Sequence, residues 1–316
     1  MNVAVIAGGI GAAKLIEGMA LFHDHDAMNV IVNVGDDTEM HGLQVCPDFD
    51  TIAYTLAGIV DPVRRWGIAD ETYHCLDMLG RYYEQEPWFN LGDKDLATHV
   101  FRTHLLRQGQ ALDTVAITIL RRLGVSVNVA PCTNDPVRTA IETVDGRTLD
   151  FQHYFVKERA NPVIKRIVVR GASDALPSPV AARALNSADG ILICPSNPYL
   201  SIDPVLAVPG IRDALMRRRD VVAFVSPIVG GEAIKGPTAK IMHELGVEPS
   251  CVGVAEHYRE VASIAIIDTV DKTREQEIHE LGFTVSTHDT IMDSRAKKAS
   301  LARHVMSMLG ELVARP

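Results

Sequence analysis

The chain has 316 residues, of which 47% are hydrophobic and 22% charged. These proportions are ordinary for a globular protein and exclude a disordered, collagen-like or coiled-coil chain, and the length fits one large domain or two small ones. The 31 basic and 40 acidic residues give a formal charge of −9, which argues against broad binding of nucleic acid or an anionic membrane but allows a local basic pocket.

The first half opens with a strand–helix–strand unit, which indicates a parallel sheet. A short apolar strand, Asn2–Ala7, ends in glycines, and a helix over Gly11–Leu21 leads to a second strand, Asn29–Val34. The stretch that follows is largely helical, with predicted helices over Thr51–Ala57, Glu71–Tyr83, Asp95–Leu106 and Thr114–Leu123. A strand over Val125–Ala130 and a hairpin that turns at Asp145-Gly146 come next.

The second half returns to an alternation of strands and helices. We predict strands over Ile164–Val169, Gly190–Cys194, Val221–Val225, Ile264–Ile267 and Phe283–Ser286. The predicted helices are Pro179–Leu185, Pro204–Arg218, Thr238–Leu245, Glu275–Leu281 and Ser294–Leu312. The whole pattern predicts an α/β fold: a single Rossmann-like domain over residues 1–316, with a mostly parallel sheet flanked by helices and a helical insertion at about residues 51–123.

The cysteines and the first residues indicate a cytoplasmic protein. Five cysteines lie far apart and form no CxxC pair, which is typical of reduced thiols and argues against a zinc site. The opening sequence MNVAVIAGG has neither the basic region nor the long apolar core of a signal peptide. No apolar run approaches the length that spans a membrane.

A glycine-rich loop connects the first strand to the first helix. Gly8, Gly9 and Gly11 allow a phosphate to approach the backbone N–H groups at a helix N-terminus, and Lys14 follows one turn later. The loop lacks the third glycine of the dinucleotide fingerprint and the Gly-Lys-Ser/Thr of a Walker loop. It therefore predicts phosphate or nucleotide contact without indicating nicotinamide.

An acidic group follows the second strand, at the sheet edge where α/β proteins bind ligands. Asp36 and Asp37 end that strand, and Asp48 and Asp50 come shortly after them. Four carboxylates this close repel one another unless a cation such as Mg²⁺ neutralises them, so all four are candidate metal ligands. Asp48 or Asp50 could instead accept a proton from an attacking hydroxyl, and the simplest alternative for Asp50 is a helix cap.

Three further segments carry polar groups. The run Trp88-Phe89-Asn90-Leu91-Gly92-Asp93-Lys94 could stack on a planar ring system, although its aromatics could equally pack and Asp93 could cap a helix. Ser196, Asn197 and Ser201 follow the strand Gly190–Cys194 in a proline-rigid loop that could recognise a base or a phosphate, and Lys235 after the next strand could neutralise a phosphate. Several polar loops at one sheet edge favour a small-molecule enzyme.

Seven segments in this order resemble the 2-phospholactate transferase family of deazaflavin coenzyme F-420 biosynthesis. They are GGIGAAKL, NVGDD, CPDFDTIAYTLAG, WGIADET, WFNLGDKDLATH, PSNPYLSIDPVL and SPIVGGEAIKGP, and they span essentially the whole chain. The resemblance implies a donor that is a guanosine diphosphate ester of a three-carbon acid, an acceptor that is the ribityl hydroxyl of the deazaflavin Fo, GMP as leaving group and Mg²⁺ as cofactor. It also places acceptor-binding positions on Asp50 and Lys94, beside Asp93.

Phosphoryl transfer depends on positioning and charge neutralisation, and this assigns roles to the candidates. The metal, the glycine loop and Lys14 or Lys235 would hold the diphosphate, the loop with Asn197 would hold guanosine, and Asp48 or Asp50 would orient or deprotonate the hydroxyl. A nucleotide-sugar-binding regulator and a nicotinamide dehydrogenase are the alternative functions. The donor acid is left open among lactate, enolpyruvate and glycerate, and a homodimer is the commonest expectation for an oligomer.

Overall fold

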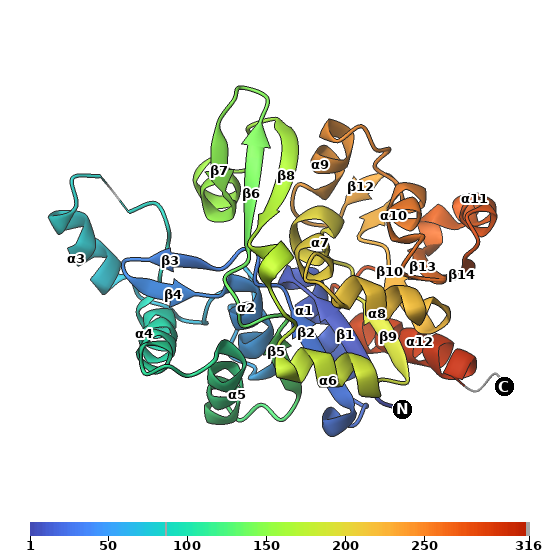
Figure 1. Ribbon diagram of the computed structural model, residues 1–316, viewed down its shortest axis with the longest axis horizontal. Helices are drawn as coiled ribbons and strands as arrows, with labels where there is room; N and C mark the ends of the chain where they lie inside the picture. Colours follow the sequence, from blue (N-terminus) through green and yellow to red (C-terminus); the bar gives the residue numbers. More distant parts are fainter. Residues whose placement is uncertain (86, 314–316) are drawn as a thin grey trace.

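The centre of the protein is a parallel sheet of seven strands, seen in a computed structural model that describes residues 1–85 and 87–313 (Figure 1). Across the sheet the strands lie in the order β5-β2-β1-β9-β10-β13-β14, and each pair is parallel. Their bounds are β1 Val3–Ala7, β2 Met28–Val32, β5 Asn128–Pro131, β9 Gly190–Ile193, β10 Val222–Val225, β13 Ile264–Asp268 and β14 Thr284–His288. The predicted α/β fold with a parallel sheet is confirmed.

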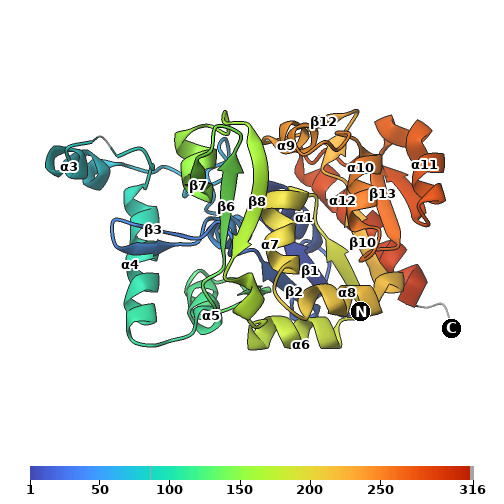
Figure 2. The ribbon, with the colours of Figure 1, turned by 45° about the horizontal axis from the view of Figure 1, so that its top comes forward.

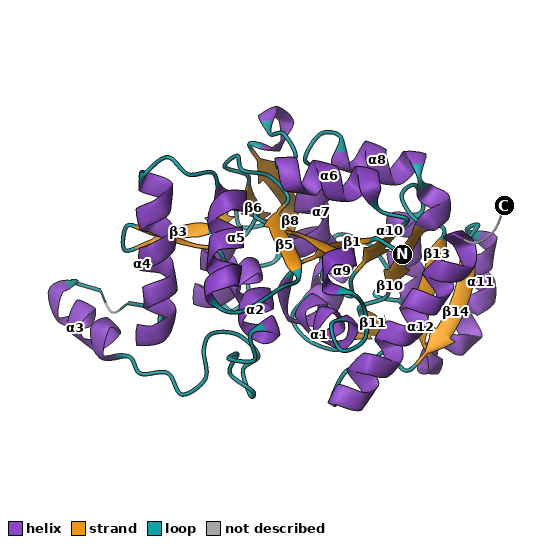
Figure 3. Cartoon of the chain, turned by 90° about the horizontal axis from the view of Figure 1, so that it is seen from below, coloured by secondary structure: helices purple, strands orange, loops and turns teal. Residues whose placement is uncertain are grey.

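Two helical layers cover the two faces of this sheet (Figure 3). Side chains alternate along a strand, so Ala4 and Ile6 of β1 join one buried cluster while Val3 and Val5 join the other. The first cluster is covered by α6 Pro179–Ser187, α8 Ile211–Arg217 and α10 Cys251–Tyr258, and the second by α1 Gly9–Met19, α2 Pro47–Leu56, α5 Leu112–Arg122 and α12 Arg295–Val313. Both faces of the strands are therefore apolar, as a parallel sheet requires.

The strand order reverses between β1 and β9. The chain runs outward from β1 to β2 and β5, then returns to the other side of β1 for β9 and continues outward from there. The loops that follow β1 and β9 consequently diverge over the two faces, and the carboxyl edge at such a point is the usual ligand site of these sheets.

A helical region connects β2 to β5 and extends away from the sheet. It holds α2, α5 and two further helices, α3 His74–Tyr82 and α4 Asp93–Arg107, and Figure 2 shows α3 projecting from the rest of the molecule. It also contains an unpredicted hairpin, β3 Thr38–Met40 and β4 Leu43–Val45, which turns at His41 and Gly42 with positive φ at both positions. These strands are too short for an alternating pattern, so the sequence carries little signal for them.

The first helix of this region starts earlier than the predicted Thr51. α2 begins at Pro47, which is favourable at a first helical position because its fixed φ suits the helix and its missing N–H is not needed there. Asp48 and Asp50 therefore lie inside the first turn, where negative charge suits the helix dipole. The predicted cap role of Asp50 is wrong, because the N-cap is Cys46 and its side chain makes no capping bond.

A small antiparallel sheet, ordered β7-β6-β8, stands beside the main one (Figure 1). Its strands are β6 Arg138–Thr143, β7 Thr148–Asp150 and β8 Ile164–Arg170. The hairpin predicted at Asp145-Gly146 is confirmed. The expectation that Ile164–Val169 continues the main alternation is wrong: β8 pairs with β6 in the small sheet, where its charged residues Lys165 and Arg166 are exposed.

The rest of the second half matches the predicted alternation except for a divided helix, the helix α10 and the short hairpin of β11 Ile228–Val229 and β12 Glu232–Ala233. The helix expected over Pro204–Arg218 is divided into α7 Asp203–Leu206 and α8, because Pro209 and Gly210, with φ of +89°, interrupt it. The helix α10 was not predicted. The remaining elements are α9 Thr238–Glu244 and α11 Glu275–Glu280.

The first and last helices cross closely in this fold. A Cβ on Gly18 of α1 would overlap the backbone carbonyl of Lys298 in α12, so only glycine permits this approach. Gly310 lies in the same α12 with open space around it. Along the described chain, no helix combines the length and apolar character needed to cross a membrane.

We expect Gly18→Ala to lower the free energy of unfolding by about 1–3 kcal/mol, because the added methyl group must push α12 away from α1. Gly310→Ala is the matched control and should raise the same quantity by about 0.5–1 kcal/mol through helix propensity alone. Urea unfolding of both variants measures the two effects. Equal stabilisation by both substitutions would contradict the close crossing.

Candidate active site

The glycine loop meets the loop after β9 at the carboxyl edge of the sheet. A Cβ on Gly8 would lie 2.7 Å from Asp48 Oδ2 and 2.7 Å from Ser201 Cβ, and one on Gly11 would overlap the carbonyl of Pro195. Three segments far apart in the sequence therefore meet at the start of α1, and glycine is the residue that allows their close approach. The N–H of Gly8, just before that helix, donates to Ser196 Oγ at 3.4 Å.

The loop after β9 is fixed by its own polar side chains. Ser196 Oγ donates to the carbonyl of Gly8 at 2.7 Å, and Asn197 Oδ1 accepts from the N–H groups of Tyr199 and Leu200 at 3.0 and 3.1 Å. Asn197 thereby caps the π-helical turn Pro198–Ile202 that carries Ser201. The predicted nucleotide-binding residues of this loop hold it rigidly against the glycine loop.

Asp36 and Asp48 share the amide of one asparagine. Asn33 Nδ2 donates to Asp48 Oδ2 at 3.0 Å and to Asp36 Oδ1 at 3.3 Å. Burial, followed by the charges of Asp48 and Asp37, raises the pKa of Asp36 well above its ordinary value, and burial raises the pKa of Asp48 to about 6. Two buried carboxylates that lie against the same asparagine amide offer oxygen ligands of the kind that a hard cation prefers.

Asp37 is buried without compensation. Neither of its carboxylate oxygens has a hydrogen-bond partner among the described residues, and the side chain lines a cavity of about 10 Å³ together with Cys46, Phe49 and Arg102. A cavity of that size holds about one water molecule. Burial raises the pKa of Asp37 to about 7, against the opposing charge of Arg138.

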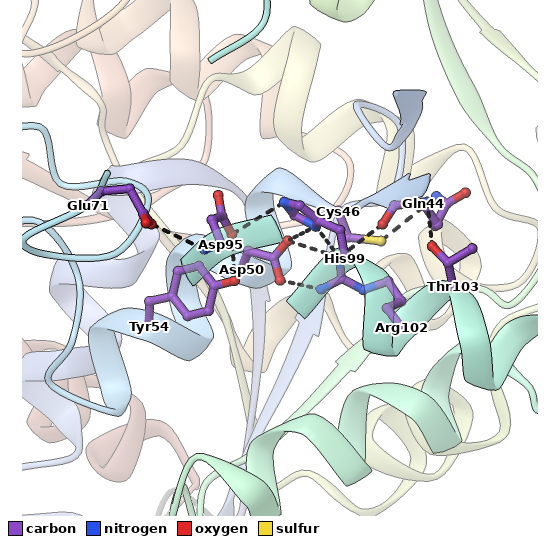
Figure 4. Close-up of polar contacts among 9 residues, drawn as sticks. All are labelled: Gln44, Cys46, Asp50, Tyr54, Glu71, Asp95, His99, Arg102 and Thr103. Atoms are coloured by element: carbon purple, nitrogen blue, oxygen red, sulfur yellow. Dashed lines mark hydrogen bonds and ion pairs between the residues drawn. The ribbon is translucent and has the colours of Figure 1, made fainter. Parts of the chain in front are cut away.

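Asp50 is paired with a buried arginine from α4 (Figure 4). Arg102 Nη1 donates to Asp50 Oδ2 at 3.1 Å, and Arg102 Nη2 bonds to Asp50 Oδ1. Arg102 is 1% exposed and Asp50 is 5% exposed. Although burial alone would lower it, the charge of Asp50 raises the pKa of Arg102. This two-bond ion pair ties the first turn of α2 to α4.

His99 extends the same network toward a second carboxylate (Figure 4). Its Nδ1 lies 3.1 Å from Arg102 Nη1 and its Nε2 lies 3.3 Å from Asp95 Oδ1, which also accepts from the hydroxyl of Tyr54 at 2.6 Å. Because an arginine can only donate, the hydrogen-bond network assigns the ring proton to Nε2. Burial works to raise the pKa of Asp95, but the bonds from His99 and Tyr54 hold it below its ordinary value.

The four predicted metal ligands do not form one cluster. In residues 1–85 and 87–313, no three of Asp36, Asp37, Asp48 and Asp50 bring ligand atoms within 4.8 Å of one another. The aspartates contact different residues instead: Asp50 bonds to Arg102, whereas Asp36 and Asp48 bond to Asn33. The one group in that part of the chain that meets this distance is Asp50, Asp95 and His99; it could hold a metal ion, but the ion would compete with Arg102 for Asp50 and with Tyr54 for Asp95.

The predicted acceptor residues lie where α4 begins. Asp93 accepts from Thr72 Oγ1 at 2.6 Å and from the N–H groups of His74 and Cys75 at 3.0 Å each, so it caps α3 and not its own helix. Lys94 is exposed and its Nζ donates to the carbonyls of Ala69 and Asp70 at 2.7 Å each. Both residues therefore tie α4 to the segment before α3.

Several residues of this site were not predicted from the sequence. Arg102, Asp95 and Asn33 carry the closest contacts to the predicted aspartates. One signal was present: Asp95, His99 and Arg102 have the spacing i, i+4, i+7, which places three polar groups on one face of a helix. Asn33 is a single polar residue at a strand end and carries no such pattern.

A family model and two similar curated proteins indicate the same family for this chain. A family model described as 2-phospho-L-lactate transferase CofD matches residues 3–307. A phosphoenolpyruvate transferase of Streptomyces griseus is 38% identical and covers 99% of each chain, and a 2-phospho-L-lactate transferase of Methanosarcina mazei is 34% identical, covering 96% of this chain and 98% of the relative. A crystal structure of a UPF0052-family protein from Bacillus halodurans matches with a TM-score of 0.63 and 18% identity over 96% of this chain and 98% of its own, which bears on the fold alone.

The raised pKa of Asp37 predicts a particular pH dependence of stability. The unfolded chain releases this proton near pH 3.8, whereas the folded protein releases it near pH 7. Between those values the folded state binds more protons, so this carboxylate makes the free energy of unfolding fall as the pH rises. Because the two pKa values differ by about three units, this carboxylate should change the free energy of unfolding by roughly 4 kcal/mol across that pH range.

We expect Asp37→Asn to remove that fall. Urea unfolding in EDTA at pH 4 and pH 8 should show the variant gaining up to roughly 4 kcal/mol over the wild type at the higher pH relative to the lower. Asp213→Asn, at an exposed aspartate of α8, is the control and should change neither value. A variant whose difference from the wild type is the same at both pH values would show that Asp37 titrates normally.

Proposed function

The chain belongs to the 2-phospho-L-lactate transferase CofD family, and on that basis we propose that it moves a phospho-three-carbon-acid group from a guanosine diphosphate ester to the terminal ribityl hydroxyl of the deazaflavin Fo. GMP leaves, and the product is coenzyme F-420-0 or its dehydro form. At the coarser level, the family and its relatives make the chain a phospholactate or phosphoenolpyruvate transferase of coenzyme F-420 biosynthesis.

The contact of Gly8 with Asp48 and Ser201 is the observation that best supports this reaction. It brings the N-terminus of α1, a buried carboxylate pair and a polar loop to one point at the carboxyl edge of the sheet. Phosphoryl transfer between two small molecules requires these three elements to be adjacent: one to hold the phosphates, one to hold a cation and one to hold the nucleoside.

Asp36 and Asp48 fit a divalent metal better than the other candidates. Both are buried, and their only shared partner is the amide of Asn33. Carboxylate oxygens suit Mg²⁺, which commonly binds through one or two carboxylates together with substrate phosphates. When bound there, Mg²⁺ would neutralise charge on the phosphoryl oxygens. Asp37 lies next in the chain and Asp50 is already paired, so neither is needed as a direct ligand.

The donor is proposed to lie between the glycine loop after β1 and the loop after β9. The N–H groups of Gly8, Gly9 and Gly11, with Lys14 and Lys235, hold its phosphates. The loop with Ser196, Asn197 and Ser201 holds its guanosine, and its rigidity favours selection of one base. Lactate, enolpyruvate and glycerate remain the candidate acids, and mass spectrometry of the product from competing donors distinguishes them.

The acceptor is proposed to lie against the helical region, near Asp50 and Lys94. The hydroxyl oxygen of Fo bonds to the phosphorus next to the acid, the bond from that phosphorus to the GMP oxygen breaks, and its electron pair leaves with GMP. Asp48 and Asp50 are the candidates to accept the hydroxyl proton. Asp50 is held by Arg102 and suits orientation of the hydroxyl. Asp48 would either bind the metal or accept the proton, because a bound cation keeps a carboxylate ionised.

We expect the protein to release GMP when it is incubated with Fo, Mg²⁺ and a guanosine diphosphate donor, and EDTA to abolish this turnover until Mg²⁺ is added back. Asp48→Asn should raise the Mg²⁺ concentration needed for half-maximal turnover by about tenfold or more. Asp213→Asn should leave it unchanged. Full turnover after proven removal of metal would refute the metal site, and nucleotide binding without any turnover would favour a regulatory protein.

Asp50→Asn should lower the free energy of unfolding by about 3–5 kcal/mol, because it leaves the buried charge of Arg102 unpaired. Turnover should fall by roughly 10²-fold or more if the carboxylate also orients the acceptor. The combined variant Asp50→Asn with Arg102→Met separates the two roles, since replacing both partners of a buried pair costs little.

We expect the combined variant to regain most of the lost stability in urea unfolding while its turnover stays low. The Michaelis constant for Fo should rise in both variants and that for the donor should not. Recovery of turnover together with stability would show that Asp50 only joins α2 to α4.

A further inference from the structure

Four basic side chains from separate segments gather along α1, beyond the glycine loop. Lys14 lies on α1, Arg65 on the loop between α2 and α3, Lys235 after β12 and Lys298 on α12. We refer to these four residues as the cationic cluster. Only Lys14 and Lys235 were predicted from the sequence to touch phosphate.

Glu17 joins two members of the cationic cluster directly. Its Oε2 accepts from Arg65 Nη2 at 3.0 Å and from Lys298 Nζ at 2.7 Å. Glu17 lies three residues after Lys14, so Lys14 shares the same face of the helix. Gly18 allows α12 to approach closely enough for Lys298 to reach this carboxylate. Glu17 and the nearby Asp293 only partly offset the charges of the four cations, so the cationic cluster keeps an excess of positive charge.

Arg65 is aimed at α1 by an unusual backbone conformation. Its φ is +66°, a left-handed value that costs a non-glycine residue roughly 1–3 kcal/mol. Asp61 maintains the turn: its Oδ1 accepts from the N–H groups of Val63 and Arg64 at 2.9 and 2.8 Å, and its carbonyl accepts from the Arg65 N–H at 2.9 Å. The Nε of Arg65 is buried with no partner among the described residues.

The other two lysines are drawn into the same positive region. Lys235 Nζ donates to the carbonyl of Arg64 at 3.0 Å, which ties the loop after β12 to the turn that carries Arg65. Burial, then the charge of Arg65, lowers the pKa of Lys14 and of Lys235. The cations therefore repel one another as they stand, and a bound anion would relieve that repulsion.

We propose that the cationic cluster binds the diphosphate of a nucleoside diphosphate, with Arg65 as the residue that distinguishes a diphosphate from a monophosphate. This rests on the proposed function for the identity of the nucleoside, but the anion site itself does not. A diphosphate offers two charged groups to cations spread over four segments, whereas a monophosphate can reach only some of them. Donor and product would then differ in affinity, and GMP would leave readily after transfer.

Titration calorimetry with GDP, GMP and inorganic pyrophosphate in Mg²⁺ tests the site. Arg65→Gln should weaken binding of GDP and of pyrophosphate by about tenfold or more, and that of GMP by less than about threefold, since one charge-assisted contact is lost. Arg217→Gln is the control: this exposed arginine lies on α8, which covers the opposite face of the sheet from α1, and affinities should not change. Arg65→Lys should restore part of the lost affinity.

If Arg65→Gln does not fold, as judged by circular dichroism, Arg65→Lys tests the selectivity: its loss of affinity for GDP and pyrophosphate should be smaller than that expected for Arg65→Gln but larger than its loss for GMP. Lys14→Gln then tests the anion site by a loss of pyrophosphate affinity. Unchanged affinity for GDP and pyrophosphate, an equal loss for GDP and GMP in the Arg65 variant, or a wild-type protein that binds no pyrophosphate would each overturn the proposal. Arg65-dependent binding of pyrophosphate in a protein that releases no GMP from Fo and donor would support this site and refute the proposed function instead.

Discussion

Burial of several carboxylates around the end of β2 and the first turn of α2 is the constraint on which the site depends. These carboxylates differ in how their burial is compensated. Asp50 pairs with Arg102, and Asp36 and Asp48 share the amide of Asn33. The carboxylate of Asp37 has no hydrogen-bond partner in the described chain. A buried carboxylate that lacks full compensation is costly, and the proposed cation would lower that cost at Asp36 and Asp48. The same local cost that weakens the unliganded protein becomes binding energy when a cation is present.

The compensated carboxylate has a structural consequence. The pair between Asp50 and Arg102 joins α2, which packs on the sheet, to α4, which lies in the projecting helical region. His99, Asp95 and Tyr54 continue the connection along the same face of α4. The position of the proposed acceptor site relative to the sheet edge is therefore set by a buried polar network, and such networks specify one geometry more strictly than apolar packing does.

The parallel sheet could be predicted from the sequence because its strands are short apolar runs that alternate with amphipathic helices. That pattern can be recognised without knowing which segments pair in the fold. It was insufficient where tertiary pairing decides: β8 has a strand pattern, yet its exposed Lys165 and Arg166 fit only the antiparallel sheet, and the turn at His41 depends on a backbone conformation that histidine seldom adopts. For the site, the glycines and aspartates were visible as motifs. Their partners Asn33 and Arg102 were not, because a partner is defined by distance in the fold. The extent of the helical insertion and the single-domain division stay predictions.

Acidic and basic side chains lie beside different parts of α1. This helix packs between α2, which carries Asp48, and α12, which carries Lys298. Its first residues face the carboxylates, and its second and third turns carry Lys14 and Glu17 among the cations. An overall charge of −9 would repel an anionic donor from most of the surface, so the local excess of cations decides where such a donor can settle. A diphosphate held along α1 would be oriented by this gradient, with one end toward the cations and the other toward the buried carboxylates that are proposed to bind the metal. Orientation of the donor thus follows from the order of charges on one helix, before any contact with the nucleoside is made.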